Sequence, residues 1–264
     1  PRGVVVATFA NMVGNNGTLS PGVRDREDLF DAPSRPWANP RAKAIVFDAF
    51  PIFDPRPVAA RIEALFPGKG GPIMNAWRTR QFEYSWLRSI SGRYVDFSAI
   101  TTDALRFTAN ALHVELTAEQ RAQLLDAYSR LTPWPDAADT LRRLRAANVR
   151  VIAIANFSPT MLRENAEHAG LTPLFDALIS TDANHTYKPD PRAYQLGVDH
   201  LKLDKRDIVF AAFGGWDAIG AKSYGYPTVW VNRMNQPPEE LGLHPDRIVT
   251  DLSGLLDFVL AQSR

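Results

Sequence analysis

The stretch Lys43-Ala44-Ile45-Val46-Phe47-Asp48-Ala49-Phe50-Pro51-Ile52-Phe53-Asp54 joins an apolar run to a carboxylate at Asp48. A continuous run of branched and aromatic residues is typical of a strand buried on both faces, as in a parallel sheet. Such a sheet carries Asp48 to its carboxyl edge, where open α/β sheets bind their ligands. Asp48 is therefore a candidate nucleophile or metal ligand, whereas an isolated Asp here would only cap a turn.

Beyond about residue 133, segments typical of strands alternate with segments typical of helices. The expected strands span residues 149–155, 177–180, 208–212, 228–231 and 248–249, and the expected helices span 136–147, 158–168, 192–201, 215–224 and 252–261. Regular alternation of this kind predicts an α/β fold with a parallel sheet.

Residues 57–132 differ, because they show helical periodicity and no strand signal. The expected helices are 58–66, 73–90, 98–112 and 117–131. This block reads as an insertion into a core made of residues 43–56 and 133–264. Residues 1–42 lack any period and read as an irregular N-terminal extension, to which we assign no chemistry.

The helix expected at 73–90 has two apolar stripes and is therefore expected to be sandwiched. One stripe contains Ile73, Trp77, Tyr84 and Leu87, and the other contains Phe82, Trp86 and Ile90. Arg78 lies on the second stripe with no acidic residue three or four positions away. If buried, its guanidinium needs an anion from elsewhere; the alternative is that it reaches water along its apolar stem.

Composition excludes several classes of function. The net charge of +1 gives no electrostatic basis for binding nucleic acid or an anionic membrane, so the expected partner is a small molecule or a protein. The absence of cysteine excludes disulfides and thiolate catalysis, and the five histidines have no metal-ligand spacing. No apolar stretch is long enough to span a bilayer, so we expect a soluble, cytoplasmic protein; because the chain starts at Pro1, export of a processed precursor stays open.

Polar residues follow the expected strands and should meet at one edge of the sheet. Four strand-to-helix corners carry them, namely Asp48, Asn156 with Ser158, Lys188 and Asp217. Parallel strands joined by right-handed crossovers bring such corners together. A lysine between two carboxylates is expected to lower their pKa values, and the helix N-termini near Ser158 and Gly215 favour an anionic ligand. The site would suit a carboxylate nucleophile that attacks an anionic substrate.

These motifs, in this order, resemble the haloacid dehalogenase superfamily and, more narrowly, the type II L-2-haloacid dehalogenases. The resemblance covers the chain from about residue 43 to its C-terminus. It is carried by Asp48, Trp77-Arg78, Tyr84-Ser85-Trp86-Leu87-Arg88, Asn156-Phe157-Ser158-Pro159, Tyr187-Lys188-Pro189-Asp190 and Gly215-Trp216-Asp217-Ala218. Several spaced motifs are far more specific than any one of them.

The resemblance implies a Rossmann-like core, a helical cap at residues 57–132, and no metal or other cofactor. Asp48 would displace halide from a short L-2-haloalkanoic acid with inversion, forming an aspartyl ester that water hydrolyses to a 2-hydroxy acid. Lys188 would hold Asp48 ionised, and Asp217 would orient Lys188 and help to activate the water. Arg78 would act with Asn156 on the leaving halide. The remaining substrate- or halide-binding residues would be Phe50, Phe82, Phe97, Ser158, Tyr194 and Trp216, and the protein would be a homodimer formed through its cap helices.

The superfamily also contains phosphatases, which this chain does not resemble at two positions. Phe50 stands where such phosphatases have a second Asp that acts as general acid, and Phe213 stands where they have an acidic magnesium ligand. Efficient phosphoryl transfer is not expected without the acid and the metal.

The chain also departs from the dehalogenase pattern. The usual Gly-Thr is Pro51-Ile52, the Ser-Asn-Gly corner is Ala155-Asn156-Phe157, and the Ser-Ser-Asn corner is Ala212-Phe213-Gly214. Losing one positioned polar group can cost a factor of about a hundred in rate. Two hypotheses follow: a working hydrolase with a drier pocket, or a catalytically impaired or non-catalytic relative that binds a small carboxylic acid or a protein in the same cleft.

Overall fold

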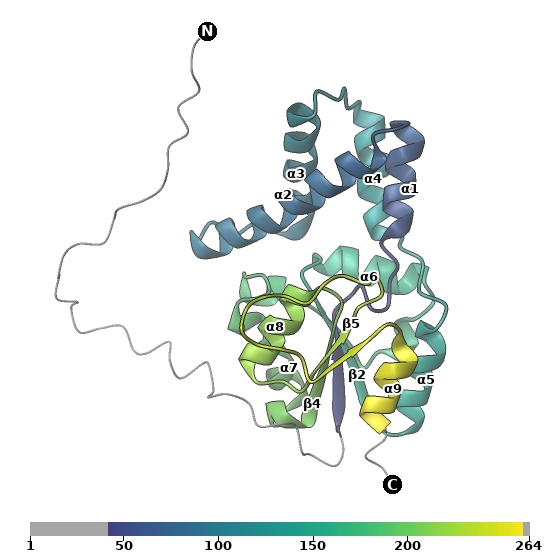
Figure 1. Cartoon of the computed structure of the whole chain (residues 1–264), viewed down its shortest axis with the longest axis vertical. Coiled ribbons are helices and arrows are strands. Elements are labelled where there is room, and N and C mark those ends of the chain that lie inside the picture. The colour runs from purple at the N-terminus through teal and green to yellow at the C-terminus, as the bar shows by residue number, and fades with distance from the viewer. Residues whose placement is uncertain (1–41, 261–264) are drawn as a thin grey trace, which may run out of the picture.

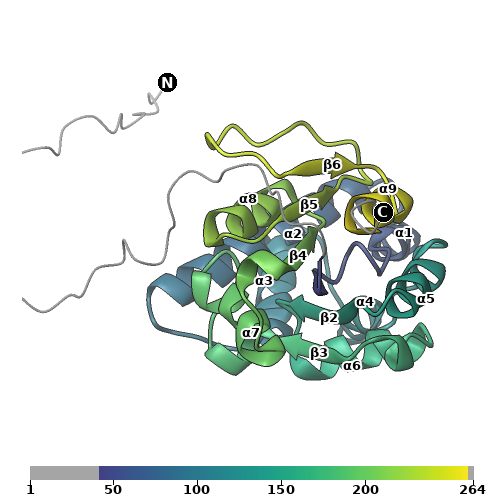
Figure 2. The same cartoon turned by 90° about the horizontal axis from the view of Figure 1, so that it is seen from below.

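The computed structural model describes residues 42–260, and its centre is a six-stranded parallel sheet in the order β3-β2-β1-β4-β5-β6 (Figures 1 and 2). The strands are β1 (Ala44–Phe47), β2 (Arg150–Ala155), β3 (Ala177–Ser180), β4 (Ile208–Ala212), β5 (Thr228–Val231) and β6 (Arg247–Val249). The predicted strands are thus confirmed. β1 lies in the middle of the sheet, where both of its faces are covered, and its four residues are therefore buried.

Helices cover both faces of the sheet (Figure 2). One face packs against α7 (Pro191–Leu201) and α8 (Gly215–Tyr224), and the other against α5 (Ala137–Ala146), α6 (Pro159–His168) and α9 (Leu252–Leu260). Successive strand residues point to opposite faces, so Ile45 joins one core cluster and Val46 the other. The predicted α/β fold is therefore correct.

The inserted helices form a cap above the carboxyl edge of the sheet (Figure 1). They are α1 (Arg56–Leu65), α2 (Gly70–Ile90), α3 (Phe97–Ala111) and α4 (Ala118–Ser129). The N-terminus of α4 has the expected capping box, in which Thr117 and Gln120 each accept the other's backbone N–H.

The two connections between cap and core are hydrogen-bonded to each other. Phe53 and Pro133 form an antiparallel bridge, the Asp54 N–H donates to Thr132 O at 2.8 Å, and the Trp134 N–H donates to Ile52 O at 2.9 Å. The chain thus enters and leaves the cap through one short two-stranded ribbon.

A buried amide ties the cap to α6 beside this ribbon. Asn165, which is fully buried, donates from Nδ2 to Tyr128 O at 2.8 Å and to Met161 O at 2.9 Å. Its Oδ1 accepts the Leu131 N–H at 2.8 Å. Both hydrogen-bonding atoms of this side chain are used, and two of its three hydrogen bonds hold the end of α4.

The two apolar stripes expected on α2 are only partly correct. Leu87 and Ile90 are 62% and 86% exposed, so the end of the helix is not sandwiched. The buried line instead continues from Ile73 and Trp77 to Gln81 and Ser85. Gln81 is accommodated because it donates to Thr101 Oγ1, and Ser85 because it donates to Gln81 O.

Within residues 42–260, none of the helices is both long and apolar enough to cross a membrane. The extension predicted for residues 1–42 lies outside the described residues, except for Ala42, which is buried at the start of the core.

Candidate active site

The side chains of Asp48, Lys188 and Asp217 meet at the carboxyl edge of the sheet, as predicted. Lys188 Nζ lies 2.7 Å from Asp48 Oδ1 and 2.7 Å from Asp217 Oδ2. The three side chains are buried, with 9%, 1% and 1% of Asp48, Lys188 and Asp217 exposed. Asp48 follows β1 directly, and its Oδ2 accepts the Phe50 N–H at 3.3 Å, so the nucleophile candidate is held at both oxygens.

Burial and charge act in opposite directions on the pKa values of this cluster. Burial alone would lower the pKa of Lys188, but the charges of Asp217 and Asp48 outweigh it, and the pKa is raised. Burial raises the pKa of Asp217 to about 6 against the opposing effect of Lys188, with a further rise caused by the charge of Asp48. Lys188 thus lowers the pKa of Asp217, as predicted, but burial has the larger effect and the net shift is upward.

Tyr194 lies below the site and not in the cleft. It is fully buried in the core cluster between the sheet and α7 and α8, and its hydroxyl donates to Asp217 Oδ1 at 2.8 Å. The expected pocket-lining position is thus incorrect, because this residue faces the sheet. What Tyr194 contacts is the carboxylate that binds Lys188.

Asn156 and Ser158 lie at the corner after β2. Asn156 Oδ1 accepts the backbone N–H of Lys188 at 2.9 Å and the Thr181 hydroxyl at 3.3 Å, while Nδ2 has no hydrogen-bond partner in the described part of the chain. Nδ2 is therefore available as a donor. Ser158 is already engaged, since its Oγ accepts the Met161 N–H at 3.3 Å and lies 2.9 Å from Ser98 Oγ of the cap. The predicted contact of Ser158 with substrate or halide does not match this geometry.

Arg78 reaches down from α2 without a carboxylate partner anywhere in residues 42–260. Its Cζ lies 5.9, 5.7 and 5.9 Å from the ring centroids of Phe50, Phe82 and Phe213. Aromatic faces attract a cation but do not neutralise it. This partly buried guanidinium can therefore bind an anion that enters the cleft.

Two aromatic residues in the site, Phe157 and Phe213, were recognised in the sequence only as departures from a polar motif. Phe50 packs edge-on against Phe157 with centroids 5.3 Å apart, and against Phe213 at 5.7 Å. The signal that could have identified them is their position, since each follows a strand that is adjacent to β1.

Cap residues complete the aromatic surroundings. Phe97 lies 5.8 Å from Phe157, and Phe82 lies 5.2 Å from Trp216. Trp86, which sequence reasoning did not include in the site, lies 6.0 Å from Trp216 and donates from its indole to Lys188 O at 3.3 Å. The predicted residues Phe50, Phe82, Phe97 and Trp216 are thus brought together around Arg78 and Asp48.

The donor set does not fit a divalent cation. No group of three or more His, Asp or Glu side chains among residues 42–260 could hold a metal ion. Both carboxylates that meet at the sheet edge are bound to the ammonium of Lys188.

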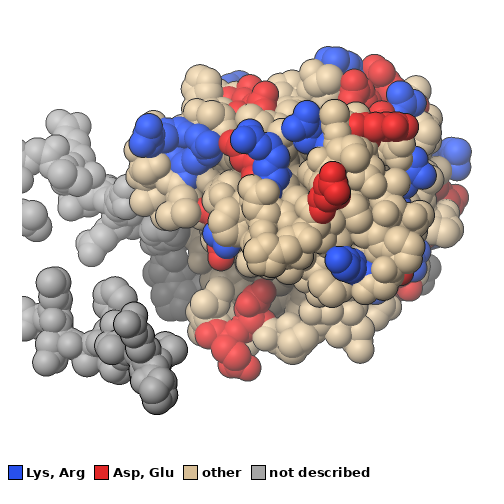
Figure 3. All heavy atoms as spheres, turned by 90° about the horizontal axis from the view of Figure 1, so that it is seen from above, with Lys and Arg blue, Asp and Glu red and all other residues tan. Residues whose placement is uncertain are grey.

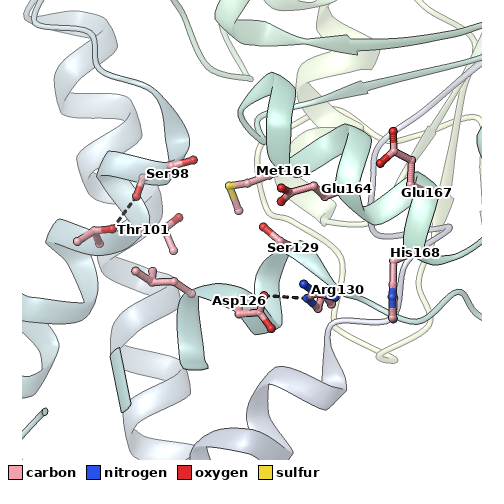
Figure 4. Close-up of a pocket in the computed structure, with 11 residues that line it drawn as sticks. Ser98, Thr101, Asp126, Ser129, Arg130, Met161, Glu164, Glu167 and His168 are labelled. Atoms are coloured by element: carbon pink, nitrogen blue, oxygen red, sulfur yellow. Dashed lines mark hydrogen bonds and ion pairs between the residues drawn. The ribbon is translucent and has the colours of Figure 1, made fainter. Parts of the chain in front are cut away.

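A separate cavity of about 470 Å³ lies between the cap and α6 (Figure 4). Its walls include Ser98 and Thr101 from α3, Asp126 from α4, Arg130 directly after α4, and Met161 from α6. Ser98 links it to the corner after β2 through Ser158. None of the predicted site residues lines it, so it is distinct from the cleft above Asp48.

Comparison with known proteins gives a consistent result. A family model described as haloacid dehalogenase-like hydrolase matches residues 10–225. The (S)-2-haloacid dehalogenase of Pseudomonas sp. (strain YL) is 42% identical over 216 residues, which are 81% of this chain and 93% of that protein. The solved L-2-haloacid dehalogenase RSc1362 superposes with a TM-score of 0.81 at 38% identity, over 83% of this chain and 99% of its own.

A third relative is the L-2-haloacid dehalogenase from Xanthobacter autotrophicus, solved with chloropropionic acid covalently bound. It superposes with a TM-score of 0.77 at 36% identity, over 82% of this chain and 98% of that one. The family match, the fold with its helical cap and the arrangement of Asp48, Lys188 and Asp217 lead to the same assignment. This chain belongs to the haloacid dehalogenase-like hydrolases.

Proposed function

We propose that this protein is a hydrolase that acts on carbon-halide bonds and converts short L-2-haloalkanoic acids into 2-hydroxy acids. The observation that carries the proposal is the pairing of Asp48 with Lys188 below an arginine that has no carboxylate partner. The arrangement offers a carboxylate to attack C2 and a cation to receive the departing halide. Relatives at up to 42% identity have this activity in their names.

The reaction proceeds in two steps. In the first, Asp48 forms a bond from a carboxylate oxygen to C2, and the carbon-halogen bond breaks so that halide leaves with its electron pair toward Arg78. In the second, water hydrolyses the aspartyl ester, which restores the Asp48 carboxylate and releases the hydroxy acid and a proton. The chloropropionic acid covalently bound to the Xanthobacter relative supports a covalent intermediate.

Each polar side chain has a separate task in this proposal. Lys188 keeps an ammonium against Asp48 in the resting enzyme, and Asp217 fixes that lysine and accepts a proton from the attacking water. Asn156 Nδ2 donates to the leaving halide or to the substrate. No step needs a metal ion.

The alternative, a non-catalytic relative that binds an acid or a protein in the same cleft, is not favoured. It leaves unexplained why the partly buried Arg78 has no carboxylate partner among residues 42–260, because a charge removed from water is costly unless it is paired or binds a ligand.

The direct test is halide release from L- and D-2-bromopropionate and from bromoacetate, with and without EDTA. We expect release from the L isomer and from bromoacetate that EDTA does not change. Asp48→Asn should abolish it, whereas the control Asp139→Asn, on an exposed face of α5, should not. Intact-mass spectrometry should detect the ester on Asp48. Absence of both halide and adduct with every acid would rule out the proposal.

We also propose that the chain forms a homodimer through its cap. Large apolar side chains are exposed at the end of α2 and on α3, with Leu87, Ile90 and Phe107 at 62%, 86% and 41%. Viewed from above, charges of both signs and uncharged residues are interspersed across the molecule (Figure 3). Light scattering should give twice the chain mass, and Leu87→Glu should halve it. Leu241→Glu, equally exposed at 63% but outside the cap, should not.

A further inference from the structure

Three adjacent strands end in corners that each carry a phenylalanine. Phe157, Phe50 and Phe213 follow β2, β1 and β4, which are neighbours in the sheet. Phe50 contacts Phe157 at 5.3 Å with an interplanar angle of 84°, and Phe213 at 5.7 Å. We call these three rings the aromatic layer.

The residues that form the aromatic layer lie beside both ends of the reaction path. At one end, the backbone N–H of Phe50 donates to Asp48 Oδ2 at 3.3 Å, so the Phe50 ring is two residues from the nucleophile. At the other, the Arg78 guanidinium lies 5.9 Å from the centroids of both Phe50 and Phe213. A haloacid that is attacked by Asp48 and releases halide toward Arg78 must therefore lie against these rings.

Two rings of the aromatic layer and the nucleophile beside them are almost completely buried. Phe157 and Phe213 are 2% and 7% exposed, and Asp48 itself is 9% exposed. A cavity with room for a branched acid would leave accessible area on the side chains that enclose it. The space next to Asp48 is therefore narrow where Phe157 and Phe213 border it, whereas Phe50, Phe82 and Trp216 are only partly buried.

The Trp216 indole fills the space beside Gly214, the residue that follows Phe213. A Cβ atom built on Gly214 would lie 2.7 Å from Trp216 Nε1 and 3.1 Å from Trp216 Cδ1, so the indole occupies the volume in which a side chain at position 214 would stand. The corner that carries Phe213 and Gly214 therefore cannot shift toward the Trp216 indole unless Trp216 moves. Trp216 is in turn packed at 5.2 Å against Phe82 of the cap.

We infer that the aromatic layer makes this enzyme prefer two-carbon haloacids, the monohaloacetates, over acids that carry an alkyl group on C2. Phe157 and Phe213 are its specificity-determining residues. The inference rests on the proposed dehalogenase activity and narrows its substrate. A pocket discriminates by about tenfold to two-hundredfold for each carbon.

The kinetic test compares kcat/KM for bromoacetate, L-2-bromopropionate and L-2-bromobutyrate. We expect a fall of about tenfold or more for each added carbon. Phe213→Ala should raise kcat/KM for L-2-bromobutyrate and so reduce the difference in kcat/KM between the three acids. Phe157→Leu, which keeps an apolar side chain in the core, should have the same effect. Leu241→Ala, at an exposed position outside the cap, should leave the ratios unchanged. Equal values in the wild type, or ratios that neither layer variant changes, would overturn the inference.

A binding measurement separates this inference from the proposed function. Calorimetry with glycolate and L-2-hydroxybutyrate requires no turnover, and we expect glycolate to bind at least about tenfold more tightly. Equal affinity, or no binding of either acid, would overturn the size preference. Preferential binding of glycolate by a protein that releases no halide would defeat the dehalogenase proposal alone.

Discussion

The hydroxyl of Tyr194 holds one oxygen of Asp217 at 2.8 Å while Lys188 Nζ holds the other at 2.7 Å. Both partners of the carboxylate are at most 1% exposed. Asp217 therefore has a fixed orientation, and its protonation state is set by burial on one side and by these two donors on the other.

The first prediction concerns pH. With a pKa of about 6, Asp217 accepts a proton as the pH falls through that value, so kcat should decrease below it. The Tyr194 hydrogen bond lowers this pKa, and Tyr194→Phe should therefore shift the acidic limb to higher pH. Rates of halide release on both sides of pH 6 test this. Tyr224→Phe, whose hydroxyl contacts Gln195 instead, is the control, and an unshifted limb in Tyr194→Phe would contradict the assignment.

The second prediction concerns Lys188. Lys188→Met would leave Asp48 and Asp217 buried without their cation, which should lower the free energy of unfolding by about 3–5 kcal/mol. Halide release should fall by a factor of about a hundred to a thousand. Urea unfolding of this variant and of Lys188→Met/Asp217→Asn would measure the effect. The double variant should recover part of the stability and none of the activity.

The third prediction separates activity from stability at Arg78. Arg78→Met should reduce halide release by about a hundredfold or more, because the departing halide loses its cation. The free energy of unfolding should change by no more than about 1 kcal/mol, since only contacts with aromatic rings are lost. Arg80→Met, which removes a similar contact with Phe107, should leave the rate unchanged. A large loss of stability in Arg78→Met would show that the arginine is structural.

The fourth prediction concerns Asn165. Asn165→Leu would leave the Leu131 N–H and the Tyr128 carbonyl buried without partners, and should lower the free energy of unfolding by about 3 kcal/mol. Asn75→Ala, on an exposed part of α2, should change it by less than about 0.5 kcal/mol. Denaturant titration of both variants provides the measurement.

The sheet and the meeting of Asp48 with Lys188 and Asp217 could be predicted from the sequence. Strands buried on both faces are continuous apolar runs, and parallel strands must present their ends at one edge. The helix spacing of Ala193, Gly197 and Leu201, all buried, could also have placed Tyr194 against the sheet, because residues three or four apart share a helix face.

Other features depend on how the cap docks, which no local pattern encodes. The Ser158 hydroxyl is occupied by a hydrogen bond with Ser98 of the cap, which is 60 residues away in the sequence. The exposure of Leu87 and Ile90 could not be predicted either, because hydrophobic periodicity shows which residues share a face but not what covers that face. Phe157 and Phe213 were missed as site residues because each was interpreted only as a departure from a family motif.

The ribbon at Phe53 and Pro133 has a mechanical consequence. Because both connections of the cap run through this one place, any rotation of the cap relative to the sheet would turn about this ribbon. Arg78, Phe82 and Phe97 would then leave the cleft together, whereas Asp48, Lys188 and Asp217 stay behind on the sheet. Such a rotation would therefore separate Arg78, the cation that receives the halide, from Asp48, the residue that carries the ester.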